Sequence, residues 1–545
     1  MSETKRASRK TLSTILLVAV FAFLGYAAYA GWLSTLFANF LPDLAWQSMT
    51  PELVVLLFAL LAPLVSLYDT DRRGMRQFTL IGLGGAFLLS LGSLLEWQFG
   101  IPGTSYNFTL AYQGSNLHGA FVVNYASQFL KVLFTATAFI AALGVGRPLK
   151  GRAEEDFGEF CSLLMFATLG MMVVASAQEL LTLLLGIEMT SLSSYLLAGM
   201  RRDRAGAEAS LKYFTIGAIS SGLLIFGISL LYGMAGTTSI PGLASRITAG
   251  GAFDTMSLVP IAMILAGLGF KISSVPFHAW APDVYAGAPV PVAGFLASAS
   301  KAMGFVAVFN VFLVGLVGVK TNWQLLVGLL AAASMVVGNL VALQQTSLRR
   351  MLAFSSIAQA GYLLIAVAVG TSAQDGGVYA VGGGLFHLVT NAAMKLGAFL
   401  AVGAVLAAGV GDHLNAWKGL GKRSPVIAFG MALFLLSMAG LPPLAGFASK
   451  FVLFSGAVDA AATQSLGWLL GLAILAVLNS ALSLYVYLRV LRTMYVEEGP
   501  EGRLVIPPSV TAAVTLCAAF VLVVGLWPQP ILDASFKAAA SLLGL

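Results

Sequence analysis

Long apolar stretches separated by short polar loops follow one another along almost the whole chain. A helix of about 20 apolar residues crosses a membrane core about 30 Å thick, and these stretches approach or exceed that length. They predict fifteen transmembrane helices, at about residues 12–30, 52–68, 77–96, 127–146, 157–176, 178–199, 209–234, 256–278, 288–316, 322–344, 350–370, 376–409, 425–456, 465–488 and 508–529.

The composition supports this interpretation. Of the 545 residues, 58% are hydrophobic and 10% are charged, whereas soluble globular proteins carry about 25% charged residues. The sequence therefore excludes a set of soluble domains and predicts an all-α polytopic membrane protein. The two cysteines, Cys161 and Cys517, both lie in apolar segments. Neither a disulfide framework nor a CxxC site is expected, so any redox chemistry belongs to a partner.

Lysine and arginine residues gather in every second loop, as the positive-inside rule requires. If the N-terminus is cytoplasmic, 21 of the 30 Lys and Arg residues fall in inside segments and 3 fall in outside segments. This asymmetry predicts a cytoplasmic N-terminus and a C-terminus on the outside.

The six remaining cationic residues are all lysines within apolar segments: Lys131, Lys212, Lys271, Lys301, Lys395 and Lys450. A charge at mid-membrane costs about 2.5–3.5 kcal/mol, so four deep lysines cost on the order of 10 kcal/mol. Such a cost indicates a function in transport. A buried lysine, unlike arginine, can lose its proton near neutral pH, so these residues are candidate proton carriers. Lys131, near the outer end of its span, is expected to reach the membrane surface, and Lys212 can do so at the inner end.

One carboxylate lies near the middle of a predicted span. Glu188 is ten residues past Gln178 and thirteen before Arg201. A satisfied internal hydrogen bond is one interpretation of a single buried carboxylate. Because several buried lysines accompany Glu188, we favour a function in proton transfer.

Two predicted spans contain both proline and lysine. They are LGFKISSVPFHAW, with Lys271 and Pro276, and SMAGLPPLAGFASKF, with Pro442, Pro443 and Lys450. Proline frees a backbone carbonyl, which is tolerated in a membrane only where protein or water satisfies it. Each interrupted span is fourth in a set of five, and the two sets run in opposite directions. This pattern is typical of transporters built from inverted repeats, and ordinary proline kinks are the alternative.

Two further lysines have polar neighbours. His387 and Lys395 are eight residues apart and therefore share one face of a helix. A buried histidine is often a structural residue, but the shared face makes a proton relay reasonable. Ser298 and Ser300 lie beside Lys301 and are expected to hydrogen-bond it or to hold a water molecule.

Other chemistry is not indicated. The sequence has no GxxxxGKS/T phosphate loop, no dinucleotide-binding fingerprint and no cluster of metal ligands. ATP-driven transport is therefore not expected, and the arginines of the inside loops follow the orientation rule and do not form a nucleic-acid patch.

Several segments resemble the N-type antiporter-like subunit of respiratory complex I and its photosynthetic and archaeal relatives. These segments are LTLLLGIEMTSLSSYLLAG, EASLKYFTIGAISSGLLIFGISLLYG, GLGFKISSVPFHAWAPDVYAGAPVPVAGFL, LRRMLAFSSIAQAGYLLI and SMAGLPPLAGFASKF. The resemblance covers about residues 50–530, and the PFHxWxPDVYxGAP run is specific to the N-type. It implies fourteen core helices, with the segment before residue 50 as one extra helix, and the ten-helix inverted repeat shared with L-type, M-type and Mrp proteins.

The resemblance also implies residue roles. Glu188 matches the carboxylate of the fifth core helix, and Lys271 matches the lysine of the broken seventh helix that pairs with it. Lys301 matches the central lysine of the eighth helix. Lys450 matches the lysine of the broken twelfth helix that faces the exit, and Lys212 matches a further lysine of the sixth helix.

The remaining motif residues are less typical of the N-type. His278 and Asp283 fall in the helix break and the inner mouth. The stretch LFHLVTNAAMKLGAFL, which contains His387 and Lys395, resembles L-type, M-type and Mrp proteins more than N-type sequences.

The expected organisation is an extra N-terminal helix and outer loop (1–49), core helices 1–3 (50–156), two five-helix repeats (157–318 and 319–490), and an inner loop with the final helix (491–545). The chain would be a subunit of a proton-translocating NADH (or related donor):quinone oxidoreductase in an energy-transducing inner, plasma or thylakoid-like membrane. It would hold no cofactor, because NADH, FMN, iron–sulfur clusters and quinone belong to partner subunits, which include other antiporter-like and small membrane subunits. The alternatives are a subunit of an Mrp-type sodium/proton antiporter and a structural assembly subunit.

Overall fold

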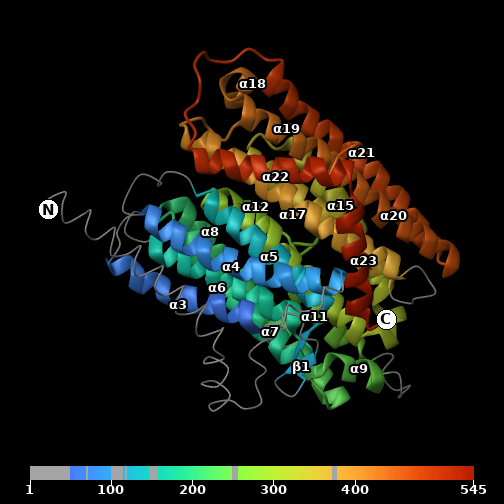
Figure 1. The fold of residues 1–545 in the computed structure, drawn as a ribbon. Helices are drawn as coiled ribbons and strands as arrows, with labels where there is room; N and C mark the ends of the chain where they lie inside the picture. Colours follow the sequence, from blue (N-terminus) through green and yellow to red (C-terminus); the bar gives the residue numbers. More distant parts are fainter. Residues whose placement is uncertain are drawn as a thin grey trace.

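The computed structural model describes residues 49–68, 72–99, 114–116, 119–145, 157–247, 256–370 and 377–545. Most of these residues are helical (Figure 1). Within these ranges, 13 helices are long and apolar enough to cross a membrane, which confirms the predicted helical, polytopic architecture. The first predicted span, residues 12–30, lies outside the described residues.

The helices fall into an earlier and a later group. The earlier group consists of α3 (Thr50–Tyr68), α4 (Arg72–Phe99), α5 (Tyr125–Leu143), α6 (Phe157–Ser176), α7 (Leu180–Gly199), α8 (Arg204–Ala235), α11 (Leu258–Ile272), α12 (Ala281–Gly287), α13 (Val290–Phe295) and α14 (Lys301–Val308). The later group consists of α15 (Lys320–Gln344), α16 (Leu348–Val369), α17 (Gly377–Ala407), α18 (Leu420–Arg423), α19 (Pro425–Ala439), α20 (Ala445–Thr463), α21 (Gly467–Tyr495), α22 (Pro508–Leu526) and α23 (Gln529–Leu543). In Figure 1 the blue and green helices form one side of the bundle and the orange and red helices the other. Helix α17 contacts both groups.

Some short elements do not follow from the apolar pattern. Strands β1 (Gly114–Asn116) and β2 (Phe121–Val123) form an antiparallel hairpin, and α9 (Ile240–Ile247) is a helix of eight residues. Helix α23 lies against α17 and α5. These two helices have 15 residues or fewer and these strands have three, which is shorter than the roughly 20 residues of a typical membrane span, so they do not stand out as spans.

Both spans that contain proline and lysine are interrupted where predicted. Helix α11 ends at Ile272 and α12 begins at Ala281, with a cis peptide bond before Pro276. Helix α19 ends at Ala439 and α20 begins at Ala445, with a cis bond between the two intervening prolines. The predicted span 425–456 is therefore two helices.

Polar side chains define where two of the helices begin. The side chain of Asp203 accepts a hydrogen bond of 2.7 Å from the backbone of Gly206 at the start of α8. The hydroxyl of Ser347 accepts one of 3.3 Å from the backbone of Arg350 at the start of α16. Such N-caps satisfy amide groups that have no partner within the helix.

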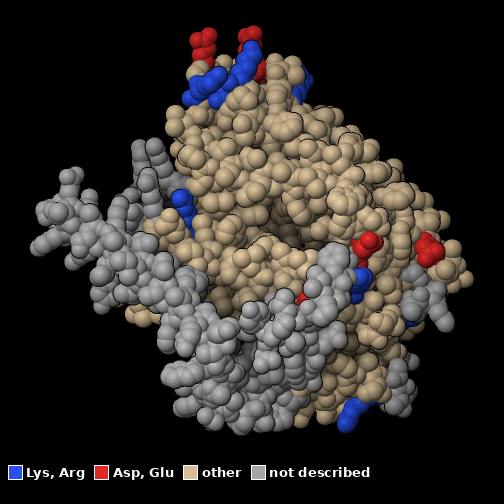
Figure 2. All heavy atoms as spheres, in the orientation of Figure 1, with Lys and Arg blue, Asp and Glu red and all other residues tan. Residues whose placement is uncertain are grey.

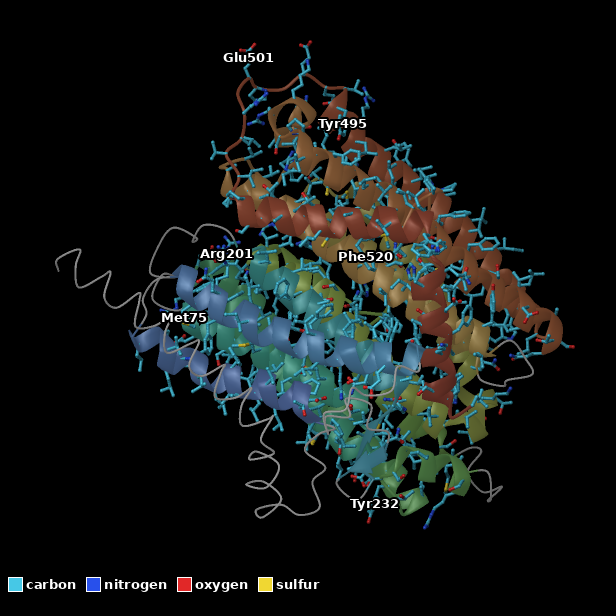
Figure 3. All side chains as sticks on the ribbon, in the orientation of Figure 1. Met75, Arg201, Tyr232, Tyr495, Glu501 and Phe520 are labelled. Atoms are coloured by element: carbon cyan, nitrogen blue, oxygen red, sulfur yellow. The ribbon has the colours of Figure 1, made fainter. Side chains whose placement is uncertain are left out.

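One end of the bundle carries most of the described cationic loop residues, and we call it the basic end. It is defined by Arg201, Arg349, Arg350, Lys418, Arg423, Arg489, Arg492 and Arg503, which flank the ends of α7, α8, α16, α19, α21 and α22. Arg201 and Tyr232 lie at opposite ends of the bundle (Figure 3).

The flanks of the bundle carry few charges. Charged side chains gather over the end that holds α18, and few others are visible on the tan part of the face in view (Figure 2). Large apolar side chains face outward on the helices: Leu185 is 70% exposed, Leu211 66% and Leu478 63%. Lipid contact accounts for such exposure in a membrane protein.

Two segments in the centre are enclosed on every side. Every residue in the most apolar stretch of α16 is buried. The same holds for the most apolar stretch of the segment Val290–Gly315. This segment contains two π-helical turns, η3 (Leu296–Ser300) and η4 (Phe309–Gly315). Polar side chains on these two segments therefore have no access to lipid.

Candidate functional site

Four of the lysines singled out in the sequence lie deep inside the bundle. Lys271, Lys301, Lys395 and Lys450 are 7%, 1%, 0% and 3% exposed, and they lie on α11, α14, α17 and α20. Lys395 lies close enough to both Lys301 and Lys450 for their positive charges to repel its own. The structure thus brings together residues that are up to 179 positions apart in the chain.

Glu188 and Lys271 are linked through hydroxyl groups of the helices around them. Glu188, on α7, accepts a hydrogen bond of 2.6 Å from the hydroxyl of Ser221 on α8. Lys271 donates to the hydroxyl of Ser191, which is three residues after Glu188 on α7. The two charged groups interact electrostatically, but the ion pairs of the described residues do not include a direct contact between them.

Aromatic rings cover the Lys271 ammonium. Its nitrogen lies 5.6 Å from the ring centre of Tyr195 and 5.2 Å from that of Phe270, within range of a cation–π contact. A Cβ atom at Gly217 would stand 2.0 Å from the Tyr195 hydroxyl oxygen. Glycine at this position of α8 is therefore required for Tyr195 to take its place beneath the ammonium.

Lys301 begins α14 directly after the π-helical turn η3. Its ammonium donates a hydrogen bond of 2.9 Å to the backbone carbonyl of Ser356 on α16. Ser298, one of the two serines beside Lys301 in the sequence, donates its hydroxyl to the carbonyls of Gly294 and Phe295 in its own helix. A serine inside a helix has those carbonyls within reach at all times.

Lys395 contacts α16 at Ser355 and Leu352, which are one and four residues before the Ser356 carbonyl that Lys301 contacts. The ammonium donates hydrogen bonds of 2.7 Å to the Ser355 hydroxyl and 3.2 Å to the Leu352 carbonyl. The Ser355 hydroxyl is also hydrogen-bonded to that of Tyr487 on α21. Lys395 therefore joins α17 to both α16 and α21.

His387 lies two turns before Lys395 on α17 and is also fully buried. One ring nitrogen, Nε2, lies 2.9 Å from Gln359 Oε1, and the other, Nδ1, lies 2.9 Å from the Ser449 hydroxyl. The Gln359 amide donates in turn to the Met438 carbonyl, at 3.4 Å. A neutral imidazole donates through one nitrogen and accepts through the other. Because Gln359 Oε1 can only accept, the neutral ring carries its hydrogen on Nε2, and Nδ1 is left to accept from Ser449.

Lys450 closes the row at the second helix break. It donates hydrogen bonds of 2.7 Å to the Met438 carbonyl and 2.9 Å to the Ser480 hydroxyl, and it lies 4.6 Å from the ring centre of Tyr362. Met438 belongs to the last turn of α19, where carbonyls have no partner within the helix and carry partial negative charge. The break thus creates a binding position for the charged form of Lys450.

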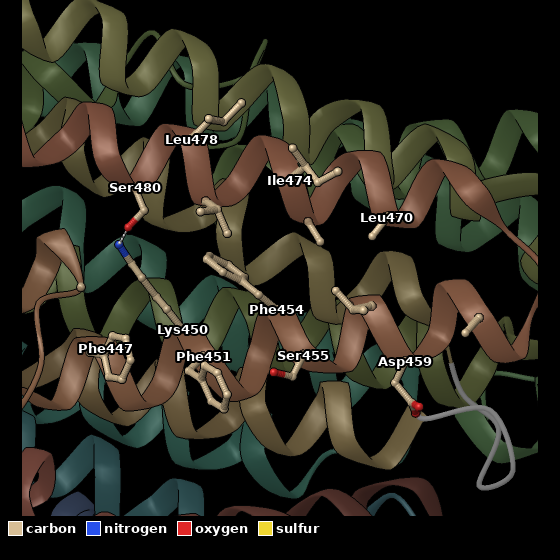
Figure 4. A pocket seen from close by; sticks show the side chains of 15 residues that line it. Phe447, Lys450, Phe451, Phe454, Ser455, Asp459, Leu470, Ile474, Leu478 and Ser480 are labelled. Atoms are coloured by element: carbon tan, nitrogen blue, oxygen red, sulfur yellow. Dashed lines mark hydrogen bonds between the residues drawn. The ribbon is translucent and has the colours of Figure 1, made fainter.

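A groove of about 800 Å³ leads to Lys450 from the flank of the bundle. It runs between α20 and α21, and Figure 4 shows Lys450 pointing across it toward Ser480. Phe447 and Phe451 line the same part of the groove, and Asp459 lies farther along α20. The groove opens on the apolar flank where Leu478 is exposed, and the exit role that the resemblance implies for Lys450 stays a prediction.

Helix α16 connects the members of the row, and this was not predicted. Ser356 contacts Lys301, Ser355 contacts Lys395, and Gln359 contacts His387. The signal in the sequence is the segment AFSSIAQAGY, in which serine, serine and glutamine occupy positions i, i+1 and i+4 of a largely apolar stretch. Three polar residues on one side of a fully buried helix must face polar partners on neighbouring helices.

Lys212 does not belong to this buried row. Its side chain is 41% exposed at the basic end and forms ion pairs of 2.6 Å with Glu208 and 2.8 Å with Asp283. Asp283 accepts a second hydrogen bond of 2.7 Å from Arg350. Partial burial raises the pKa of Asp283, but the hydrogen bonds from Lys212 and Arg350 outweigh burial and hold this pKa below its ordinary value. His278 lies in the break between α11 and α12.

The expectation that Lys131 reaches the membrane surface is wrong. Its side chain is fully buried and forms an ion pair of 2.7 Å with Glu52 of α3, which is itself buried. The ammonium also lies 5.2 Å from the ring centre of Phe121. A carboxylate on a neighbouring helix compensates the charge, so Lys131 does not have to reach water.

The match to a known family decides what kind of protein this is. Residues 177–479 match the family described as NADH:quinone oxidoreductase/Mrp antiporter, TM. This chain belongs to that family. F(420)H(2) dehydrogenase subunit N of Methanosarcina mazei is 39% identical to this chain over 515 residues. The match covers 91% of this chain and 98% of the relative. NADH-quinone oxidoreductase subunit N of Trichlorobacter lovleyi is 40% identical over 426 residues, 77% of the chain and 84% of the relative.

Solved structures give the same family. A chain of respiratory complex I from Thermus thermophilus is 30% identical to this family member, with a TM-score of 0.70 over 89% of this chain and 98% of that one. A chain of the Mrp complex from Dietzia sp. DQ12-45-1b has a TM-score of 0.77 at 22% identity, over 92% of this chain and 98% of that one. At that identity the second likeness concerns the fold alone.

Proposed function

We propose that this chain is a proton-translocating membrane subunit of a complex I-type quinone oxidoreductase. The observation that supports this most is the row of buried protonatable side chains, each hydrogen-bonded to a hydroxyl, amide or carbonyl group. The relay consists of Glu188, Lys271, Lys301, Lys395, His387 and Lys450, with Lys212 at its entrance. Placing lysines inside a membrane costs free energy, and a function in accepting and releasing protons explains why this chain contains them there.

The first step depends on the charge of Glu188. At an effective dielectric constant of about 20, two unit charges about 8 Å apart interact by about 2 kcal/mol, and this energy is lost when they move far apart. A change of about 2 kcal/mol alters the proton affinity of a lysine more than tenfold. Lys271 therefore holds its proton while Glu188 is near and charged, and releases it toward Lys301 when a change transmitted from the quinone-reducing subunits separates them.

The later steps use groups that contact α16. A proton that reaches Lys301 passes to Lys395, with which Lys301 interacts electrostatically. The Gln359 amide and the Met438 carbonyl do not carry a proton themselves but hold His387 and Lys450 in place, and in this proposal the proton moves from Lys395 to Lys450 along water molecules. Repulsion from the next proton to enter the row drives release from Lys450.

Electron transfer takes place outside this chain in this proposal. The relatives carry the names of two different electron donors, F420H2 and NADH, so the step they share with this chain is the one in the membrane. NADH or a related donor, FMN, iron–sulfur clusters and quinone would belong to partner subunits, along with other antiporter-like subunits. The basic end would face the cytoplasm of an energy-transducing membrane, in accord with the positive-inside rule.

The experiment replaces the first lysine in the assembled complex. Lys271→Ala is expected to lower proton translocation into inverted membrane vesicles and, through coupling, quinone reduction, both per assembled complex. Lys537→Ala, at an exposed position on α23, serves as the control and should behave as wild type. Wild-type rates of both reactions in Lys271→Ala would overturn the proposal.

Antiport of a cation is the second candidate, because the segment around His387 and Lys395 resembles Mrp proteins. A sodium/proton antiporter would use the same lysines, but its proton movement would depend on sodium. Vesicles energised in sodium-free buffer distinguish the two functions. Proton translocation at the wild-type rate without sodium is expected here, and a requirement for sodium would favour the antiporter.

A further inference from the structure

The half-helix α12 is too short to be stable on its own. It contains seven residues, whereas isolated helices shorter than about 12 residues are marginal in water. Its conformation must therefore be imposed by its neighbours. These contacts matter for the proposed function because α12 is the second half of the broken helix that carries Lys271.

Two cations from different helices hold α12 through Asp283. Lys212 of α8 donates to one carboxylate oxygen at 2.8 Å, and Arg350 of α16 donates to the other at 2.7 Å. Hydrogen bonds between charged groups are about twice as strong as those between neutral groups. Asp283 is thus a bridge between a helix that lines the Glu188 region and the helix that contacts the rest of the row.

Two more arginines hold the last turn of α12. Arg349 donates to the carbonyl of Ala286, and Arg201 donates to the carbonyl of Gly287 at 3.4 Å. The final carbonyls of a helix have no partner within it and carry partial negative charge. These contacts again connect α12 to both α8 and α16, since Arg201 precedes α8 and Arg349 belongs to α16.

The first end of α12 is tied to the backbone beside Lys271. Trp280 directly precedes α12, and its indole NH donates to the carbonyl of Phe270 at 3.1 Å. The same indole stacks on Tyr213 of α8, with ring centres 4.4 Å apart and planes at 9°. A displacement of α12 would therefore move the carbonyl that comes immediately before Lys271.

We propose that Asp283 is a positioning residue for proton transfer, which keeps α12 and Lys271 in register with α16 through its bridge between Lys212 and Arg350. This inference rests on the proposed function. Without the bridge, the side chain of Arg349 still links α16 to α12, but Lys271 is held less firmly relative to the acceptor Lys301. Transfer from Lys271 to Lys301 becomes slow because the hydrogen-bonded geometry that it needs is populated for a smaller part of the time.

The test is Asp283→Asn in the complete complex, with proton translocation measured per assembled complex. The change keeps the shape of the side chain and removes its charge. We expect at least half of the loss that Lys271→Ala causes, and about tenfold faster amide hydrogen exchange in α12, as a free-energy change of about 1.4 kcal/mol gives. Glu497→Gln is the matched control, because Glu497 is similarly exposed at 30%, faces Lys418 and Arg492 at the same basic end and does not contact α12.

Two further variants separate positioning from a general effect on folding. Asp283→Glu should restore most of the translocation rate, because a carboxylate can again reach both cations. Asp283→Asn combined with Arg350→Gln should lose no more than Asp283→Asn alone, because both changes break one unit. If Asp283→Asn does not assemble, Arg350→Gln is measured in the same way and should show a smaller loss of the same kind.

The outcomes distinguish the two proposals. Rates for Asp283→Asn and Arg350→Gln equal to those of Glu497→Gln, while Lys271→Ala still loses translocation, would overturn the role of Asp283 alone. A full rate in Lys271→Ala would overturn the proposed function itself.

Discussion

Gly440 lies at the second helix break, and a single methyl group added there should disturb the proton relay. Its φ of +84° is in the left-handed region, which an alanine rarely adopts. A Cβ atom at this position would stand 3.3 Å from the Ser480 hydroxyl and 3.4 Å from Cδ of Lys450. The Gly440→Ala substitution therefore changes the backbone and presses on Lys450 and on one of its two hydrogen-bond acceptors.

The magnitude follows from these two effects. The left-handed conformation costs an alanine about 1–2 kcal/mol. The contact adds a displacement of a few tenths of an ångström for Lys450 or Ser480, on a hydrogen bond of 2.9 Å that supports a buried charge. Loss of a hydrogen bond to a charged group is worth about 1.5–3 kcal/mol, so partial loss adds about 1 kcal/mol. A proton transfer that depends on this geometry should slow by roughly fivefold to tenfold.

Gly409 supplies a control for the backbone effect alone. It has the same φ of +84°, and a Cβ atom there would meet no atom within 4 Å. Both alanine variants should lower the melting temperature of the purified complex, but only Gly440→Ala should slow proton translocation into vesicles per assembled complex. Equal translocation rates in the two variants would refute the assignment of Lys450 to the relay through this geometry.

Three other predictions concern buried and interfacial charges. Glu52→Gln or Lys131→Met alone should destabilise the complex by about 3–5 kcal/mol because each leaves a buried charge unpaired, and the double variant should recover most of this stability in thermal unfolding; additive losses would contradict the buried pair. Ser355→Ala should slow proton translocation per assembled complex, because it removes a hydrogen-bond acceptor of Lys395, and an unchanged rate would exclude Ser355 from the relay. Because the pKa of Asp283 is lowered, its contribution to stability is complete above the ordinary carboxyl pKa and is lost as the pH falls through the lowered value. The difference in unfolding temperature between wild type and Asp283→Asn should therefore vanish in acid. A difference that grows on acidification would contradict this prediction.

Much of the fold could be predicted because membrane helices leave a strong pattern in the sequence. Apolar length defined the spans, and proline beside lysine identified the two interruptions that the structure contains at Ile272–Ala281 and Ala439–Ala445. The short elements could not be predicted in this way. Helix α23 has 15 residues and α9 has eight, so neither has the length that makes a span recognisable.

The site was predicted as a set of residues but not as a set of contacts. Buried lysines are conspicuous because charge is rare in apolar segments, and all four deep ones are enclosed in the structure. Their partners are mostly serine hydroxyls and backbone carbonyls. These groups are common in membrane helices, so the sequence does not show which of them contact a lysine. Lys131 shows the limit most clearly, because its depth depends on Glu52, a residue 79 positions away that only the folded chain brings next to it.

If the buried lysines release and regain protons, a side chain at position 450 that stays charged must stop proton transfer, and Lys450→Arg provides such a side chain. Arginine keeps the positive charge and can still donate to the Met438 carbonyl and the Ser480 hydroxyl, but it does not deprotonate in proteins. The measurement is proton translocation into vesicles per assembled complex, with Lys537→Arg as the control at an exposed lysine. Lys450→Arg is expected to abolish the contribution of this subunit while Lys537→Arg retains it, and wild-type translocation in Lys450→Arg would mean that proton transfer does not require deprotonation of Lys450.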